Sequence, residues 1–437
     1  MSIVNNLKDH KQIGQELELF FTNDIAPGAP FWLPFGMIIF KELEKYIREL
    51  TEKAGYQETL TPIMVKSQLF KESGHFEKFG EHNMYNLILS DEANDSKPVQ
   101  YTLKPMNCPE STILYRFRPR SYKELPLRFS EIGRLHRREK SGEVNGLLRV
   151  RQLTMDDAHI YAREDQIFDE ISNILDMMAQ FYKKFGFEYE FRFATRPENR
   201  AGTDDIWNKA EKDLADVIKK KGIKAGDKKG DGAFYGPKID VHIKDSLGRE
   251  WQLATVQLDF HQPEAFKLVY IDHNGKEKRP VMIHRAIFGS FERFIGILTE
   301  HYQGAFPLWL SPVQVLVIPI ADRHVEFASS IVRTIELQEI RVRLDSRQET
   351  VSSKIRDGSL QKVPYIGIIG DSEVKSSRLP KTGTVGQAKA DGGQAKLKVQ
   401  SYEDSFISIR TRRGGDLGQL RLSQFLNKLK EEIDKKI

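Results

Sequence analysis

The side chains with the clearest chemical potential stand between residues 125 and 161, in LPLRFSEIGRLHRREKSGEVNGLLRVRQLTMDDAHIY. This segment places Arg137, Glu139 and Arg149 around a loop that contains glycine. Two guanidinium groups can hold phosphate oxygens through paired hydrogen bonds, and a carboxylate between them can accept from an exocyclic amine. Any one of these arginines, taken alone, is better explained by a charged surface hairpin. Together the three side chains predict a phosphate-binding site.

A second group lies in IHRAIFGSFERFIGIL, residues 283–298, where Gly289, Glu292 and Arg293 fall on an expected amphipathic helix. A third feature is GYQETLTPIM, in which an expected strand follows a helix and contains Pro62. The chain has no GxGxxG or GxxxxGK[ST] phosphate loop. A bound nucleotide would therefore have to be held by another device.

Composition limits the class of protein. The 437 residues carry 67 Lys and Arg against 62 Asp and Glu, a formal charge of +5 that permits nucleic-acid binding without requiring it. With 39% hydrophobic residues the chain can bury a core and is not disordered or collagen-like. A single cysteine, Cys108, excludes an internal disulfide and fits a reducing compartment. No apolar signal core is present, so we expect a cytoplasmic protein without a membrane segment.

The elements that must position these residues follow from apolar periodicity. Long helices combine with antiparallel strands in the N-terminal part, which favours an α+β domain built on an antiparallel sheet and argues against a Rossmann enzyme. The predicted elements are helices at 39–50 and 167–181 and strands at 58–64, 239–243 and 251–260.

After Ser311-Pro312 the pattern changes to short strands that alternate with helices. The predicted strands are 313–320, 340–344, 363–370 and 406–410, and the predicted helices are 325–335 and a final helix from 422. This pattern predicts a small α/β domain. Two segments without periodicity, 219–230 and 376–400, are expected to be a solvated lysine-rich surface and a mobile loop.

Three of these features resemble motifs 1, 2 and 3 of class II aminoacyl-tRNA synthetases: GYQETLTPIM, the 125–161 segment and the FGSFERFIGIL stretch. Within that class, further stretches resemble the threonyl-tRNA synthetases. They are FFTNDIAPGAPFW, SGHFEKF, LKPMNCPE, FYGPKID, TVQLDF, FPLWLSPVQV and RTRRGGDLG. The matches run in order along nearly the whole chain. The resemblance implies a class II catalytic domain over 1–308, followed by an anticodon-binding domain over 309–437.

The resemblance also implies an activity. Members of the family ligate L-threonine to tRNA(Thr) in two steps through threonyl-adenylate, using ATP with Mg²⁺ and releasing AMP and diphosphate. Motif 1 implies a homodimer, because in this class its strand and helix form the subunit interface.

A zinc ion, one per subunit, is implied in the amino-acid pocket, with Cys108, His159 and His284 as the matching ligands. They show no local ligand spacing, and each alone is better explained as a core thiol or an ordinary histidine. Three such ligands leave zinc an open position, which in this family binds the amino group and hydroxyl of threonine. Asp157 and Tyr235 match residues that contact that hydroxyl and that amino group, although alone they would be a structural aspartate and a core tyrosine.

For ATP, the resemblance assigns Arg137 to the α-phosphate and the amino-acid carboxylate, and Glu139 to the adenine amine. Arg149 matches a contact to the outer phosphates, and Arg293 matches one to the adenine face and the γ-phosphate. Positioning and neutralisation of phosphate charge then carry the first step. His75 matches a histidine that assists attack by the 2′-hydroxyl of the terminal adenosine, although alone it would be a solvent-facing loop residue.

The RTRRG run supplies the expected anticodon contacts, Arg410, Arg412 and Arg413. Their planar cations can stack on unpaired bases and bond to base edges, although any one of them could simply end a charged strand. The two lysine-rich segments could add phosphate contacts that weaken with salt.

Some positions depart from the family pattern. Glu110 and Ser111 stand in place of the usual Gly-His, Leu153 in place of the aromatic residue that stacks on adenine, and Met155 in place of a glutamine. We expect weaker ATP binding and one polar contact fewer near the substrate. The chain begins almost at the catalytic domain, so we also expect that it charges threonine without hydrolysing Ser-tRNA, a task left to a separate trans-editing protein.

Two alternatives remain. One is a synthetase paralogue that binds tRNA or mRNA without acylation, which Arg137, Glu139, Arg293 and the zinc positions argue against. The other is a class II enzyme for proline or serine, whose pockets do not share the Cys/His/His set in this form.

Overall fold

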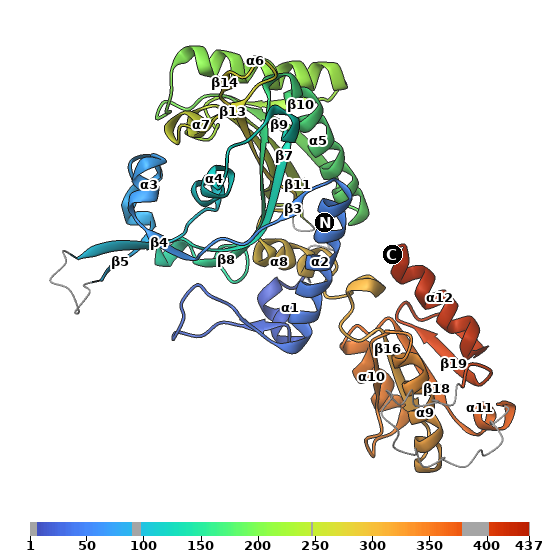
Figure 1. Cartoon of the computed structure of the whole chain (residues 1–437). Helices are drawn as coiled ribbons and strands as arrows, with labels where there is room; N and C mark the ends of the chain where they lie inside the picture. The colour runs from blue at the N-terminus through green and yellow to red at the C-terminus, as the bar shows by residue number, and fades with distance from the viewer. Residues whose placement is uncertain (1–6, 90–97, 246–247, 378–401, 437) are drawn as a thin grey trace, which may run out of the picture. The chain divides into compact units, whose positions relative to one another are not determined.

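The computed structural model describes residues 7–89, 98–245, 248–377 and 402–436, which form two compact units (Figure 1). Unit 1 comprises residues 7–13, 20–33 and 43–301, and unit 2 comprises 14–19, 34–42 and the described residues from 302 onward. The expected mobile loop at 376–400 lies outside the described residues from 378 onward, so it stays a prediction. Within the described part, no helix is long and apolar enough to cross a bilayer.

Unit 1 is built on an eight-stranded sheet in the order β10-β9-β11-β12-β15-β8-β7-β3. Its strands are β3 (Gln57–Glu58), β7 (Leu127–His136), β8 (Gln152–Ala162), β9 (Tyr189–Ala194), β10 (Ala225–Lys228), β11 (Lys238–Lys244), β12 (Glu250–Asp259) and β15 (Val281–Ala286). Neighbouring strands run antiparallel except in the edge pairs β10/β9 and β7/β3. The predicted α+β class and the predicted β11–β12 hairpin are thereby confirmed.

One face of this sheet is covered by α5 (Ile167–Lys184), as Figure 1 shows. The apolar positions predicted from its periodicity are buried, among them Ile171, Leu175 and Met178. Phe181 of α5 lies 5.3 Å, between ring centroids, from Phe294 of α8 (Phe291–His301). This face therefore holds the main core of unit 1.

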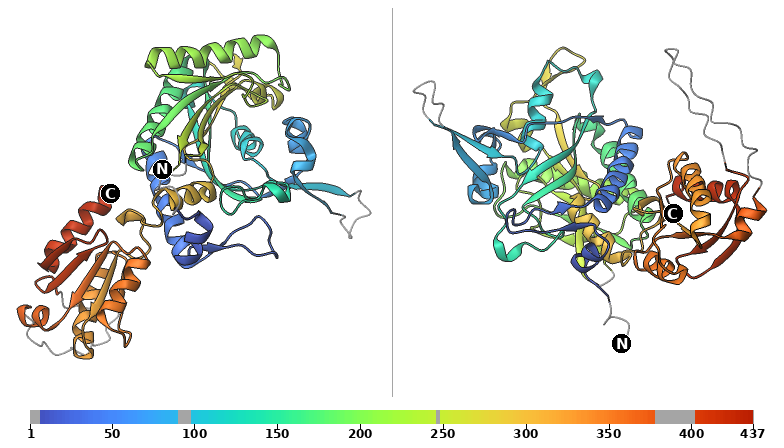
Figure 2. Two further views of the ribbon diagram at one scale, coloured as in Figure 1. Left: turned by 180° about the vertical axis from the view of Figure 1, so that it is seen from behind. Right: turned by 90° about the horizontal axis from the view of Figure 1, so that it is seen from below.

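The opposite face carries α4 (Cys108–Arg116), which lies on the other side of the sheet from α5 (Figure 2, left). Cys108 and Tyr115 of α4 join Phe129, Tyr161 and Met282 of the sheet in an apolar cluster. The first residue of α4 is thus held directly above the strands.

The predicted strand over 58–64 is wrong in its extent. β3 ends at Glu58, and β4 (Met64–Lys66) begins in a separate sheet, because Pro62 has no amide hydrogen for a strand ladder. Apart from short 3-10 helices, the remaining elements of unit 1 are α1 (His10–Glu16, which continues into unit 2), β1 (Phe20–Phe21), β2 (Phe31–Trp32), α2 (Pro34–Lys53, shared between the units), α3 (Gln68–Glu72), the π-helical turn η2 (Phe76–Gly80), β5 (Tyr85–Leu89), β6 (Val99–Leu103), α6 (Asp204–Lys221), α7 (His261–Ala265), β13 (Tyr270–Ile271) and β14 (Glu277–Lys278).

Unit 2 contains a five-stranded sheet in the order β17-β16-β18-β19-β20. Its elements are β16 (Val315–Pro319), α9 (Val325–Glu336), β17 (Val342–Leu344), α10 (Val351–Leu360), β18 (Tyr365–Ile369), α11 (Asp371–Ser376), β19 (Phe406–Thr411), β20 (Asp416–Arg421) and α12 (Leu422–Asp434). The predicted α/β class is confirmed. The sequence pattern does not predict β20, because this strand is largely exposed and lacks an apolar alternation.

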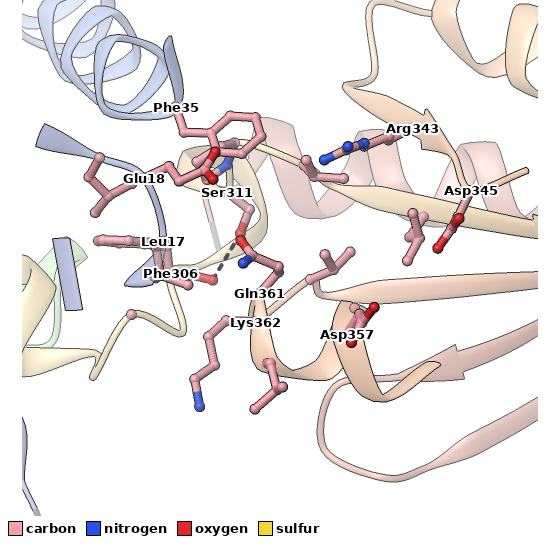
Figure 3. Close-up of a pocket in the computed structure, with 18 of the residues that line it drawn as sticks. Leu17, Glu18, Phe35, Phe306, Ser311, Arg343, Asp345, Asp357, Gln361 and Lys362 are labelled. Carbon is pink, nitrogen blue, oxygen red and sulfur yellow. Dashed lines mark hydrogen bonds between the residues drawn. The ribbon is translucent and has the colours of Figure 1, made fainter. Parts of the chain in front are cut away.

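A cavity of about 430 Å³ lies in unit 2 and is lined by residues of β17, α10 and the N-terminal segments of that unit (Figure 3). On one wall, the Ser311 hydroxyl donates to the carbonyl oxygen of Phe306 at 3.1 Å. None of the site residues predicted above lines this cavity. The candidate metal ligands lie instead in unit 1, on and above its sheet.

The core face of unit 1 contains a buried ion pair. Nη1 of Arg285 lies 2.5 Å from Oδ1 of Asp156, and both side chains are nearly inaccessible. The second carboxylate oxygen of Asp156 accepts the backbone N–H of Ile287 at 2.7 Å. Asp156 therefore neutralises a buried cation and also fixes the chain where it leaves β15.

Removing this carboxylate would leave Arg285 buried without its counter-charge. We predict that Asp156→Ala lowers the free energy of unfolding by about 3–5 kcal/mol. Equilibrium urea unfolding followed by circular dichroism measures the change. The exposed Asp227→Ala serves as the control, with a shift below about 0.5 kcal/mol. Equal stability of the two variants would contradict the prediction.

Candidate metal centre and nucleotide-binding site

Strand register places the main candidate residues on one face of the sheet. Gln257 of β12 pairs with His284 of β15, and His284 pairs with His159 of β8. Residues that pair directly across antiparallel strands project from the same face. The next residue on that face of β8, in the direction of the N-terminus, is Asp157. These side chains therefore share the face that carries α4.

Cys108, at the start of α4, completes a compact group with the two histidines. Each of Cys108, His159 and His284 offers a ligand atom that lies within 4.8 Å of the others, and all three side chains are buried. The histidine rings meet edge to face, with centroids 5.0 Å apart. Three residues that are far apart in sequence thus form a group with the donor types that suit zinc.

The surroundings of this group fit a cation. Nε2 of His284 lies 2.9 Å from Oδ2 of Asp259, which leaves the other ring nitrogen for a ligand, as in metal-binding histidines. Burial lowers the pKa of His159 well below its usual value, so its ring is neutral and can ligate. Burial, reinforced by the charge of Asp157, raises the pKa of the Cys108 thiol well above its usual value. A bound cation would reverse that shift by stabilising the thiolate.

Asp157 stands beside the group. Its Oδ1 lies 4.0 Å from Nε2 of His159, and its Oδ2 accepts from Nδ2 of Asn107 at 3.0 Å. Burial raises the pKa of Asp157 to about 6, and the hydrogen bond from Asn107 opposes that shift. Tyr235 stacks on His284 with centroids 4.7 Å apart. Asp157 and Tyr235 therefore place two polar side chains beside the candidate metal ligands.

His75 is fully buried, so the solvent-facing alternative from the sequence is wrong. Its Nδ1 lies 2.7 Å from the hydroxyl of Ser73, and its Nε2 lies 3.6 Å from the sulfur of Cys108. Burial, followed by the charge of His284, lowers the pKa of His75 to about 3. The ring is therefore neutral near pH 7 and can accept a hydrogen bond, although it is a weak base.

The arginines predicted to bind phosphate also come together. Arg137 donates from Nε to the carbonyl oxygen of Pro105 at 3.2 Å, and Arg293 donates from Nε to that of Leu148 at 2.9 Å. Burial, then the positive charges of Arg137 and Arg149, lowers the pKa of Arg293. Arg149 is paired with Glu139 at 2.8 Å. The structure brings these four side chains into one charged site, which suits a polyphosphate.

In unit 2, Arg410 is exposed and pairs with Ile366 of β18. Arg413 is also exposed, whereas Nη1 of Arg412 donates to the carbonyl oxygens of Phe306 and Lys362 at 3.0 and 2.9 Å. Arg410 and Arg413 thus have accessible side chains, and Arg412 is tied to the backbone.

A further candidate in unit 2 was missed from sequence. β16 lies between β17 and β18, and the crevice beyond its carboxyl end is where open α/β sheets bind ligands. Lys354 lines a cavity there and is only 4% exposed. A lone lysine in a helix carries no motif, so only the topology could have singled it out.

Comparisons with known proteins agree with this geometry. Residues 89–302 match the family model "tRNA synthetase class II core domain (G, H, P, S and T)", and residues 314–432 match "Anticodon binding domain". The chain is 46% identical to threonine–tRNA ligase of Carboxydothermus hydrogenoformans and 45% identical to that of Clostridium kluyveri, over 98% of its own length in each case. It spans 62% of the length of each of these relatives.

A solved structure decides the family. It is described as the RNA binding domain of threonyl-tRNA synthetase from Cryptosporidium parvum Iowa II, and it is 34% identical, with a TM-score of 0.86. The match covers 97% of this chain and 98% of that one. The chain belongs to the threonyl-tRNA synthetase family. A putative threonyl-tRNA synthetase from Aeropyrum pernix, 26% identical over 98% of the chain, has a TM-score of 0.76.

The positions that depart from the threonyl-tRNA synthetase pattern are buried or partly buried. Leu153 lies in an apolar cluster with Leu135 and Val150, and Met155 packs against this cluster. Glu110 is buried, and burial raises its pKa to about 8. Ser111 shares a hydrogen bond of 2.9 Å with the hydroxyl of Tyr161. These side chains belong to the packing around the site.

Two polar side chains that were not predicted from the sequence support the predicted ones. Gln257 accepts from the hydroxyl of Tyr235 at 2.5 Å, and Asp259 bonds to His284. Both lie in TVQLDF, which was matched to the threonyl-tRNA synthetases without a role for either residue. The alternation of β12 could have placed Gln257 and Asp259 on one face, but not beside these partners.

The loop that carries Tyr235 depends on Gly236. A Cβ at this position would lie 2.0 Å from the carbonyl oxygen of Leu258, a contact with backbone that cannot move aside. We predict that Gly236→Ala lowers the free energy of unfolding by about 1–3 kcal/mol and displaces Tyr235. Thermal unfolding measures the loss. Gly142→Ala, which has open space around its Cβ, is the control, and equal melting temperatures would contradict the prediction.

Proposed function

We propose that this chain activates L-threonine with ATP and transfers it to tRNA(Thr). The observation that carries the proposal is the meeting of Cys108, His159 and His284 on the sheet face that also holds Asp157. The nearby arginines supply the second half of the site, for a triphosphate. Family membership supports the same reading, although the relatives are longer than this chain.

The Cys/His/His group would hold one Zn²⁺ per subunit. When bound, zinc would supply a Lewis acid with an open position for the amino group and hydroxyl of threonine. Asp157 would accept from the hydroxyl, and Tyr235 would contact the amino group. Valine lacks the hydroxyl and would leave these polar groups unpaired, so selection against it can exceed what shape alone provides. Serine keeps the hydroxyl and is the expected error.

In the first step the threonine carboxylate attacks the α-phosphorus of ATP, and diphosphate leaves. Arg137 would hold the α-phosphate and the attacking carboxylate, Glu139 the adenine amine, and Arg149 and Arg293 the outer phosphates. ATP would arrive with Mg²⁺, which shares the neutralisation of phosphate charge. No covalent enzyme nucleophile is needed, because positioning and charge neutralisation suffice.

In the second step the 2′-hydroxyl of the terminal adenosine attacks the carbonyl carbon of threonyl-adenylate, and AMP leaves. Nε2 of His75 would accept a hydrogen bond from the attacking hydroxyl, because burial lowers the pKa of His75 to about 3 and keeps its ring neutral, and the hydroxyl proton would leave with the phosphate of AMP. The neighbouring Ser73 holds Nδ1 and so fixes the ring. In the catalytic domain, His75 therefore joins Arg137 and Arg293 as the proposed catalytic residues.

Unit 2 would bind the anticodon. Arg410 and Arg413 have accessible side chains for unpaired bases, while Arg412 would act mainly by holding the end of β19. The proposed division into 1–308 and 309–437 remains a prediction.

A homodimer is proposed from exposed apolar side chains around the Pro62 segment. Leu60 is 81% exposed, and Ile63 and Met64 are also exposed. Exposed apolar residues that gather in one segment mark interaction sites. A cytoplasmic location and a separate trans-editing protein for Ser-tRNA are proposed on the family resemblance alone.

Amino-acid-dependent exchange of pyrophosphate into ATP tests the activity. We predict exchange with threonine, weaker exchange with serine and almost none with valine or proline, followed by charging of tRNA(Thr). Exchange with proline alone, or tRNA binding without any exchange, would overturn the proposal. Preformed Ser-tRNA should persist with these 437 residues alone, and its rapid hydrolysis would refute the editing expectation.

Metal content tests the pocket separately. We predict about one zinc per chain in the purified protein and almost none in Cys108→Ser, because the serine hydroxyl is a poor zinc ligand. Elemental analysis after dialysis measures both. Ser172→Ala changes a buried hydroxyl on α5 and serves as the control. Equal zinc in Cys108→Ser and in the control would remove Cys108 from the ligand set.

A further inference from the structure

Asn107 is an asparagine at an N-cap that does not cap its helix. It occupies the N-cap of α4, yet its side chain makes no capping hydrogen bond. Asparagine is among the preferred N-cap residues because its side-chain oxygen accepts a free backbone N–H, which contributes about 1 kcal/mol. The Asn107 side chain does not provide this stabilisation to α4. The amide of Asn107 must therefore be held in place by something else.

The amide is turned toward Asp157 instead. Nδ2 of Asn107 donates to Oδ2 of Asp157 at 3.0 Å, and Asn107 is fully buried. Because an ionised carboxylate only accepts, this bond fixes which end of the amide faces Asp157. The remaining oxygen, Oδ1, is buried and has no partner among the described residues. A buried acceptor without a hydrogen-bond partner costs about 1–3 kcal/mol of stability. A donor group that reached Oδ1 would remove this cost.

Gly133 of β7 makes the arrangement possible. A Cβ on Gly133 would lie 2.4 Å from Oδ1 and 2.5 Å from Nδ2 of Asn107. The amide therefore lies flat against the backbone of Gly133, in the space that any side chain there would fill. Gly133 pairs with Met155, two residues before Asp157 on β8, so the amide sits on the face that carries the proposed threonine pocket.

The turn before α4 also reaches the nucleotide side of the site. Its Pro105 carbonyl accepts from Arg137, and its Lys104 carbonyl accepts from the backbone N–H of His136. Asn107 thus ends a short turn that is tied to the proposed phosphate arginine at one end and to Asp157 at the other. A shift of this turn would move both, whereas loss of the amide alone would affect Asp157 only.

We propose that Asn107 is a positioning and specificity residue for threonine. It holds the Asp157 carboxylate with Nδ2 and offers Oδ1 to a donor group of the bound amino acid, and Gly133 keeps the space for its amide. This inference rests on the proposed function and adds to it a residue that touches the amino acid but not ATP.

The test compares Asn107→Ala and Gly133→Ala with the wild-type chain in pyrophosphate exchange. We predict that both variants raise KM for threonine roughly tenfold or more, as expected for loss of a bond to a charged group, while KM for ATP changes less than about twofold. The preference for threonine over valine falls by a similar factor. Calorimetric titration of threonine alone should show the same weakening, independently of turnover.

Two controls keep the result interpretable. Gly226→Ala, whose Cβ would have an ordinary contact of 3.7 Å, should keep both KM values. Asn107→Ser, which can restore the helix cap but cannot span to Asp157, should behave as Asn107→Ala does. Thermal unfolding identifies any variant that has lost its fold. If only one of Asn107→Ala and Gly133→Ala is folded, the folded variant tests the proposal.

The outcomes separate the two levels of the proposal. Unchanged KM for threonine in folded variants, or equal rises for threonine and ATP, would overturn the role of Asn107 while the proposed function stands. Recovery of threonine affinity in Asn107→Ser, whose side chain cannot reach Asp157, would also overturn the role of the Asn107 amide. Failure of the wild-type chain to exchange with threonine would overturn the proposed function and this inference with it.

Discussion

The strand register of the unit 1 sheet is the constraint on which the candidate site depends. Gln257, His284 and His159 are direct partners across three neighbouring antiparallel strands, so their side chains form one row on one face. Side chains alternate along a strand, and a slip of one residue would therefore send a whole strand's contribution to the opposite face. The opposite face is packed against α5 and is apolar apart from buried pairs such as Arg285 and Asp156. Burial of that face thus secures the register, and the register positions the site.

Around that row, several buried polar side chains of the proposed site are held by other polar side chains. Asp259 holds His284, Gln257 accepts from Tyr235, and Asn107 bonds to Asp157. Such partners fix ring orientations and carboxylate positions before any ligand arrives, which reduces the cost of binding. Burial in turn sets the protonation states of two of these groups: it keeps the ring of His159 neutral, and it keeps the proton on the Cys108 thiol unless a cation is bound. The site is thus electrostatically suited to a divalent ion and a zwitterionic amino acid.

Much of this architecture could be predicted from the sequence, because local periodicity reports directly on burial. The spacing of apolar residues located α5, and alternation located the β11–β12 hairpin. The strand predicted at 58–64 failed because Pro62 outweighs the propensity of its neighbours. The convergence of Cys108, His159 and His284 could not be derived from spacing at all, since it arises from register and from the docking of α4. Only the resemblance to a family brought them together beforehand.

The supporting residues could not be predicted from the sequence for a related reason. Nothing in LKPMNCPE distinguishes an asparagine that caps a helix from one that turns away from it, because both have the same local sequence. The burial of His75 and the backbone bonds of Arg412 likewise depend on segments distant in sequence. Contacts of this kind depend on tertiary geometry, which periodicity does not contain.

We propose that the thiolate of Cys108, at the start of α4, and the imidazoles of His159 and His284 on the sheet bind a single metal ion. X-ray absorption at the zinc edge of the purified chain tests it most directly. We expect one sulfur at about 2.3 Å and two imidazole nitrogens at about 2.0–2.1 Å, with a remaining light ligand. A shell without sulfur, or with only one imidazole, would contradict it.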